Sequence, residues 1–350
     1  MELSSYTKAL LEDLERRIDP EVEDDFYAQW AKFWAGEHEE VVFRPKRKNL
    51  SVPSVELKEI NINDSIADYE TMLQAELIAA HKRLGGSAGV PCVRSNYGTG
   101  IMTSLFGAEL FIMPYEMNTL PTTRSLNDSD AVRRILEKGA PDLETGFGKD
   151  VFRMGEIYAE VFAKYPKIQK YVYVYHPDTQ GPLDIAELLW GGEMFYEMYD
   201  DPDFVHAVIR LITDTYKRLL DRWYTIIPKR EGMSVHWGWL HPGNIMVRND
   251  SAMNLSPDMY KEFAFPYDNE LLEYYGGGCV HFCGKGDHYI DVLAQAPKLY
   301  GVHMSQPEYN DLNKIYSAIR NNGKRLLAQK PVAIEVYCKH PLAAPSTVHG

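Results

Sequence analysis

Short apolar segments alternate with helical patterns along most of this sequence, and this alternation limits the folds that the chain can adopt. Eight segments read as strands, and they lie at 90–95, 110–114, 170–176, 232–237, 244–250, 279–283, 299–305 and 324–329. Eight strands with helical crossovers predict an α/β fold, a (β/α)8 TIM-like barrel. An open doubly wound sheet is the alternative.

Helix start signals support the alternation. Asp201-Pro202 opens one long helix, and Ser256-Pro257 opens another, with Pro at the first helical position, where its missing N–H costs nothing. The interval 238–243 is too short for a crossover helix. Either that connection is irregular, or one of the two segments beside it is not a strand.

The chain is expected to divide into an N-terminal helical extension, residues 1–60, and the barrel, residues 61–350. The extension should hold two charged helices broken at Asp19-Pro20. A long amphipathic helix then follows, with Asp64 as its N-cap.

Charge excludes some classes of ligand. The chain has 37 Lys and Arg against 50 Asp and Glu, a net charge of −13. Because phosphate backbones are bound by clustered basic residues, nucleic acid is not expected as a main ligand. The longest basic run is "RPKRK" at 44–48, which we interpret as a solvated loop.

Cysteine use and hydropathy indicate the compartment. The four cysteines, at 92, 279, 283 and 338, form no disulfide framework, so reduced thiols are expected. No stretch approaches the roughly 18 apolar residues that a membrane span needs. The N-terminus is too charged for a signal peptide. These features predict a cytoplasmic protein without a membrane partner.

Polar residues recur at the ends of the predicted strands, where a barrel gathers its chemistry. A lone His at a strand end is more often a packed residue, but here the pattern repeats along the chain. We expect catalytic roles for His176, Asp178, His236 and Asp250. We expect a small-molecule substrate to contact Asn96, Tyr97, Gln180, Trp237, His303 and Ser305.

The stretch "GGGCVHFCGKGDH", residues 276–288, suggests a metal site. In a strand, residues two apart face the same side about 6.6 Å apart, so His281 and Cys283 can share one zinc. Cys279 would lie about 13 Å from Cys283, so we expect it to fill the core. A catalytic zinc needs a third protein ligand, for which Cys338 is a candidate. The alternative is a buried strand without metal.

Residues 254–284, "NLSPDMYKEFAFPYDNELLEYYGGGCVHFCG", resemble the uroporphyrinogen decarboxylase superfamily, with its Ser-Pro-opened helix and H-x-C-G strand. The preceding "NIMVRNDSAMNLSP" looks like the family's Asp-bearing strand and loop. The segment 181–209 is similar to its helix pair, and the likeness covers roughly 170–330. The resemblance implies a (β/α)8 barrel with an N-terminal helical extension.

The resemblance implies two activities. One is cofactor-free decarboxylation of a tetrapyrrole, and the other is zinc-dependent transfer of a methyl group between a corrinoid protein and a thiol such as coenzyme M. The methyltransferases hold zinc with H-x-C and a distant Cys, which His281 and Cys283 match in part. Cys338 is not expected to be a tight ligand, because its segment reads as a helix opened by Pro331.

The methyltransferase is the leading interpretation, because no Arg-rich, carboxylate-binding loop precedes residue 100. Asp250 would orient the zinc-bound His or take the thiol proton, or it would only cap the next turn. A corrinoid protein and a second copy of the chain, as a homodimer, are the expected partners. The alternatives are a decarboxylase of a porphyrinogen-like polycarboxylate and a non-catalytic tetrapyrrole or corrinoid binder, whose pocket Trp239 would help to line.

Overall fold

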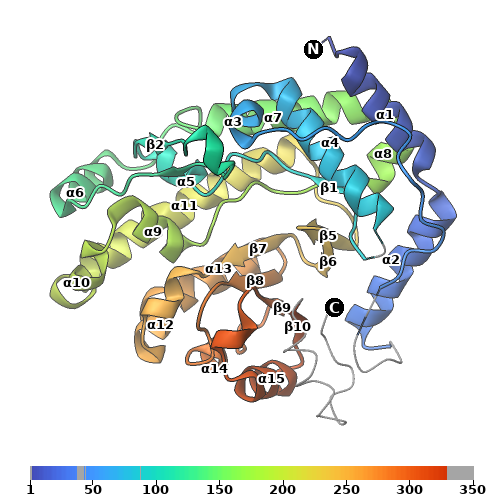
Figure 1. Cartoon of the computed structure of the whole chain (residues 1–350). Coiled ribbons are helices and arrows are strands. Elements are labelled where there is room, and N and C mark those ends of the chain that lie inside the picture. Colours follow the sequence, from blue (N-terminus) through green and yellow to red (C-terminus); the bar gives the residue numbers. More distant parts are fainter. Residues whose placement is uncertain (1, 38–42, 44, 87, 329–350) are drawn as a thin grey trace.

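Parallel strands form the centre of the C-terminal part of the chain (Figure 1). A computed structural model describes residues 2–37, 43, 45–86 and 88–328. Within them, one four-stranded parallel sheet has the order β10-β9-β8-β7. Its strands are β7 (Ile245–Arg248), β8 (Gly278–Phe282), β9 (Leu299–Met304) and β10 (Arg325–Ala328). Helices α12 (Pro257–Phe263), α13 (Phe265–Tyr274), α14 (Ile290–Leu293) and α15 (Leu312–Asn321) connect them.

A second parallel pair comes from earlier in the chain, where β1 (Cys92–Val93) pairs with β4 (Tyr173–Val174). Between the two parallel units lies a hairpin of β5 (Met233–His236) and β6 (Trp239–Pro242). The hairpin bridges them, because β5 contacts β4 while β6 contacts β8 and β9. The α/β class with parallel strands is therefore confirmed.

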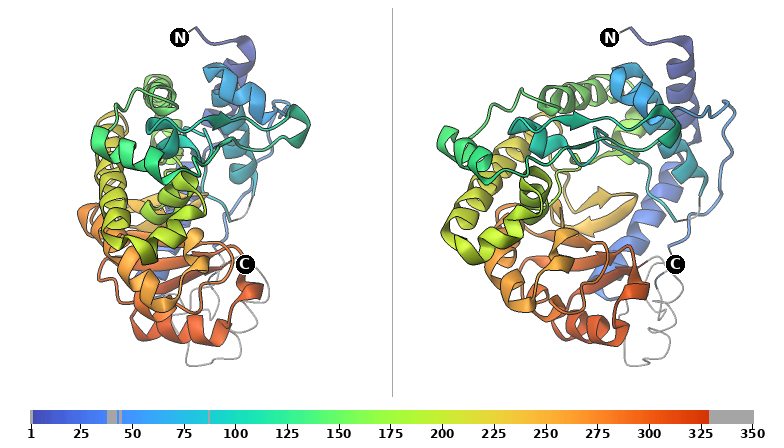
Figure 2. Two further views of the ribbon diagram at one scale, coloured as in Figure 1. Left: turned by 90° about the vertical axis from the view of Figure 1, so that its left-hand side faces the viewer. Right: turned by 60° about the vertical axis from the view of Figure 1, so that its left-hand side comes forward.

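The remaining helices pack around these strands, as the two views of Figure 2 show. They are α1 (Ser5–Arg17), α2 (Pro20–Ala35), α3 (Ile62–Ala67), α4 (Tyr69–Gly85), α5 (Ile101–Leu105), α6 (Ser129–Lys138), α7 (Gly148–Phe162), α8 (Pro166–Tyr171), α9 (Pro182–Trp190), α10 (Glu193–Asp200) and α11 (Pro202–Ile226). None of the helices in these described ranges is both long and apolar enough to cross a membrane.

Each of the eight predicted strand segments contains a strand, but two predictions need correction. The segment 110–114 holds β2 (Leu110–Phe111), which pairs antiparallel with β3 (Thr122–Thr123) and is half-exposed. The interval 238–243 holds β6, so its connection is a hairpin. Its two turn residues, Trp237 and Gly238, have φ of 48° and 87°, the signs that a type I′ turn requires.

Helix starts follow the predicted signals, with one exception. The Asp201 side chain accepts the Phe204 N–H at the start of α11, and Ser256 caps α12 in the same way. The expected single helix from Asp64 is instead two helices, because Asp68 is extended and caps α4. The prediction that Asp64 is the cap was therefore wrong, and Asp64 lies inside α3.

The predicted solvated loop at 44–48 is also wrong for Arg47. This side chain is buried and forms a two-point ion pair with Glu23, at 2.6 and 3.0 Å. It also donates to the carbonyls of Gly86 and Gly89, at 2.7 and 2.9 Å. A guanidinium has five N–H donors, so one Arg can join α2 to the loop that leads into β1.

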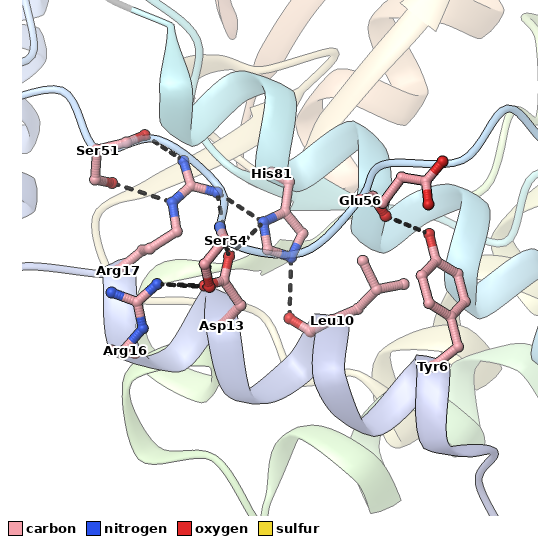
Figure 3. Close-up of polar contacts among 9 residues, drawn as sticks. All are labelled: Tyr6, Leu10, Asp13, Arg16, Arg17, Ser51, Ser54, Glu56 and His81. Atoms are coloured by element: carbon pink, nitrogen blue, oxygen red, sulfur yellow. Dashed lines mark hydrogen bonds and ion pairs between the residues drawn. The ribbon is translucent and has the colours of Figure 1, made fainter.

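Helix α1 is held on α4 by a buried polar cluster (Figure 3). The His81 Nε2 lies 2.9 Å from the Leu10 carbonyl, which can only accept, so Nε2 carries the proton. Nδ1 must then accept from Arg17 Nη1, 2.7 Å away. Burial, followed by the Arg17 charge, lowers the pKa of His81 below its usual 6.5. The fold therefore contains the neutral imidazole.

We expect His81→Gln to make the protein less sensitive to acid. Because the folded-state pKa is lowered, the contribution of His81 to stability is present above the unfolded pKa of about 6.5 and is lost as pH falls below it. Glutamine can accept from Arg17 and donate to Leu10 without titrating. Urea titrations give the unfolding free energy at pH 7.5 and at pH 5.5. The difference between these two values should be about 1 kcal/mol smaller in the variant than in the wild-type protein. An unchanged difference would contradict this assignment.

Candidate metal centre

Three potential metal ligands meet at the ends of β7 and β8. The parallel pairing of these strands sets Arg248 beside His281, so Asp250 follows the end of β7 where Cys283 follows the end of β8. The Cys283 Sγ lies 3.4 Å from His281 Nε2, and Asp250 Oδ1 lies 3.6 Å from the same nitrogen. All three ligand atoms lie within 4.8 Å of one another.

The two separations from His281 Nε2 fit a tetrahedral zinc ion. Zinc bonds to nitrogen, oxygen and sulfur are about 2.0–2.3 Å long, so two ligand atoms at a tetrahedral angle are about 3.4–3.6 Å apart. Thiolate, imidazole and carboxylate are all accepted zinc donors. Asp250, predicted to orient the zinc-bound His or to accept a proton, thus lies where it could supply a third donor atom.

The other cysteines differ in position from Cys283. Cys279 is fully buried in the core, and burial raises the pKa of its thiol. Cys338 lies outside the described residues.

The imidazole of His281 is in the form that a metal binds. Burial, followed by the neighbouring His303 and Arg248, lowers its pKa well below the usual value, so the ring is neutral. Its Nδ1 lies 2.7 Å from Nδ1 of His303, and the two rings stack. Burial and Arg248 lower the pKa of His303 to about 4. One neutral ring must therefore donate and the other accept.

The Cys283 thiol needs a cation to ionise at neutral pH. Burial and the Asp250 charge raise its pKa to about 11. The Ser305 hydroxyl donates to Sγ at 3.0 Å, and Asp250 Oδ1 accepts the Cys283 N–H at 2.7 Å. Ser305, predicted to bind substrate, thus lies against a potential metal ligand.

A buried ion-pair cluster adjoins this triad. Arg248 lies 2.8 Å from Asp178 and 2.7 Å from His236 Nε2, and its guanidinium stacks over the Trp237 ring at 4.7 Å. The Trp237 ring in turn lies 4.8 Å from that of His281. Asp178, His236 and His281 therefore belong to one continuous group of contacts, in which Trp237 is the half-buried link between cluster and triad.

Two more predicted residues, His176 and Gln180, lie farther along this group. The His176 ring is 4.7 Å from that of His236, and its Nε2 accepts the Met246 N–H at 3.1 Å. Burial and Arg248 lower the pKa of His176 to about 3. Gln180 donates to Asp178 at 2.5 Å, in a strained backbone conformation with φ of 62°.

Two predicted substrate contacts pack elsewhere. Asn96 donates to Glu76 at 3.0 Å, and Glu76 also accepts the Arg94 N–H. Because Arg94 binds Asp178 at 3.1 Å, Asn96 joins the ion-pair cluster only indirectly. Tyr97 is buried in the core, with its ring 5.1 Å from that of Phe147. A substrate contact by Tyr97 stays a prediction.

Sequence reasoning missed Arg248, Arg94 and Asp184. Arg248 ends the apolar run "IMV" as the last residue of β7, and a charge at the end of a buried strand is a signal of a buried pair. Asp184 accepts the N–H groups of Asp250 and Ser251, at 2.9 and 2.8 Å. Burial and the Asp250 charge raise its pKa well above the usual value.

Comparison of the sequence with models of known protein families gives no match, and comparison with curated proteins finds no similar one. The assignment of this site therefore depends on its geometry.

We expect the purified protein to hold about one zinc per chain, as a single site of this type requires. Cys283→Ala and Asp250→Ala should each lose the metal, because each removes one of three donors. Cys279→Ala is the matched control, since it removes a thiol of β8 that is buried in the core. Metal analysis after gel filtration measures the content. Full zinc in Cys283→Ala would contradict the assignment.

Proposed function

We propose that the chain is a zinc-dependent methyltransferase of the uroporphyrinogen decarboxylase superfamily, which moves a methyl group between a corrinoid protein and a thiol. The observation that carries this proposal is the donor set of Asp250, His281 and Cys283 at neighbouring strand ends. The two parallel units and the hairpin between them are compatible with a (β/α)8 barrel, whose sites lie at these ends.

Asp250, His281 and Cys283 would hold the zinc, with a fourth position open to the incoming thiol. Zinc bound there would lower the pKa of that thiol, so that the nucleophilic thiolate is present at neutral pH. Ser305 supports the site, because its hydroxyl donates to Cys283 Sγ and this bond strengthens when the sulfur is charged.

His303 fixes the proton of His281. With its Nε2 facing Cys283 and Asp250, His281 must carry its proton on Nδ1 and donate it to His303 Nδ1. The proton of His303 is then on its own Nε2. This arrangement orients the imidazole of His281, the role that partners of metal-binding histidines usually have.

The proton balance assigns a role to Asp250. When a thiol takes a methyl group from the corrinoid, the carbon–cobalt electron pair stays with cobalt, the new carbon–sulfur bond uses a sulfur pair, and the S–H proton must leave. Asp250 contacts its neighbours through Oδ1, and its Oδ2 would accept that proton.

The decarboxylase alternative has less support. Arg248 and Arg94 are the buried cations nearest the site that could bind a substrate carboxylate, but both already bind Asp178. Their shared ion pair with Asp178 already balances part of this positive charge, which weakens the case for a bound substrate carboxylate.

We expect the zinc-loaded protein to demethylate free methylcobalamin in the presence of coenzyme M under anoxic conditions, which the absorbance change of the corrinoid measures. Cys283→Ala should reduce the zinc-dependent rate at least about 100-fold, because the metal supplies several kcal/mol of stabilisation. Cys279→Ala should keep it. Zinc-loaded protein that gives no rate above thiol alone, with coenzyme M and with a panel of other thiols, would overturn the proposal.

A further inference from the structure

A buried carboxylate, that of Asp184, lies directly behind the turn that carries Asp250. Asp184 belongs to the first turn of α9, and only 2% of its surface is exposed. Its Oδ2 accepts the N–H of Asp250 at 2.9 Å, and its Oδ1 accepts the N–H of Ser251 at 2.8 Å. Both oxygens therefore bind backbone donors of one turn, which fixes the position of that turn as well as its orientation.

The chain reaches this position at a conformational cost. The start of α9 lies so close to the end of β7 that a Cβ at Gly181 would be 2.0 Å from the Arg248 carbonyl oxygen. The residue before it, Gln180, has φ of 62°, a region that costs a residue with a side chain about 1–2 kcal/mol. Close approach and backbone strain thus accompany the placement of Asp184 against the Asp250 turn.

The ordinary role of an acid in this position does not account for its contacts. An acidic residue in the first turn of a helix usually stabilises the helix dipole or binds the free N–H groups of its own helix. Asp184 instead binds amides 66 and 67 residues away in sequence. The contacts therefore join two βα connections, those that follow β4 and β7.

We propose that Asp184 is the positioning residue of the metal centre, which holds Asp250 within ligand distance of His281 and Cys283 without touching the metal itself. The turn is fixed from two sides, because Asp184 binds its backbone while Asp250 Oδ1 binds the Cys283 N–H at 2.7 Å. This inference rests on the proposed function only in taking Asp250 as a metal ligand.

Asp184→Asn tests the proposal, because the side-chain NH2 of Asn cannot accept a hydrogen bond and one of the two amides loses its partner. We expect Co²⁺, titrated by its d–d and thiolate absorption bands, to bind 10–100-fold more weakly than to the wild-type protein. The matched control is Asp268→Asn. Asp268 is also a fully buried acid, and it accepts from the side-chain NH2 of Asn249, the residue before Asp250, at 2.7 Å. It should destabilise the fold and keep the Co²⁺ affinity.

Folded Asp184→Asn with wild-type Co²⁺ affinity would overturn this inference and leave the proposed function intact. Wild-type protein that binds neither Co²⁺ nor Zn²⁺ would overturn both. Hydrogen exchange on the wild-type protein provides a second measurement that needs no variant. The amides of Asp250 and Ser251 should exchange slowly, and exchange at the rate of a free peptide would also overturn the role of Asp184.

Discussion

The parallel pairing of β7 with β8 is the constraint on which the candidate site depends. A slip of one residue would turn every side chain of β8 to the opposite face, so His281 would no longer face Asp250. Gly278 contributes to this register, because a Cβ there would lie 1.9 Å from the Ile245 carbonyl oxygen. The glycine that begins β8 therefore helps to position the metal centre, although none of its atoms is a ligand.

Arg248 organises the second half of the site. It is a permanent cation in a buried position, and the carboxylate of Asp178 balances its charge. The imidazoles around it have lowered pKa values, with burial as the main cause and Arg248 as a further one. Neutral histidines can accept hydrogen bonds and bind metal, so this cation helps to keep the surrounding rings in the state that the proposed chemistry requires.

Local signals predicted much of the fold and part of the site. Strand segments, the starts of α2, α11 and α12, and the same-face spacing of His281 and Cys283 each depend on a few adjacent residues. The β5–β6 hairpin was missed, because Trp237-Gly238 lacks the usual Asn or Asp of a type I′ turn. The role of Asp250 as a third donor could not be predicted, because it depends on the pairing of β7 with β8. The burial of Asp184 could not be predicted either, because an isolated acid in the sequence does not show which partners it will have.

The position of Trp237 gives the protein an optical reporter of its own. The indole contacts a guanidinium and three imidazole rings, one of which belongs to a candidate metal ligand. The emission of an indole responds to nearby charge and to groups that quench its excited state. Arrival of a divalent ion at His281 would change the charge beside the ring while that of Arg248 stayed constant, so occupancy of the site could be followed without any added dye.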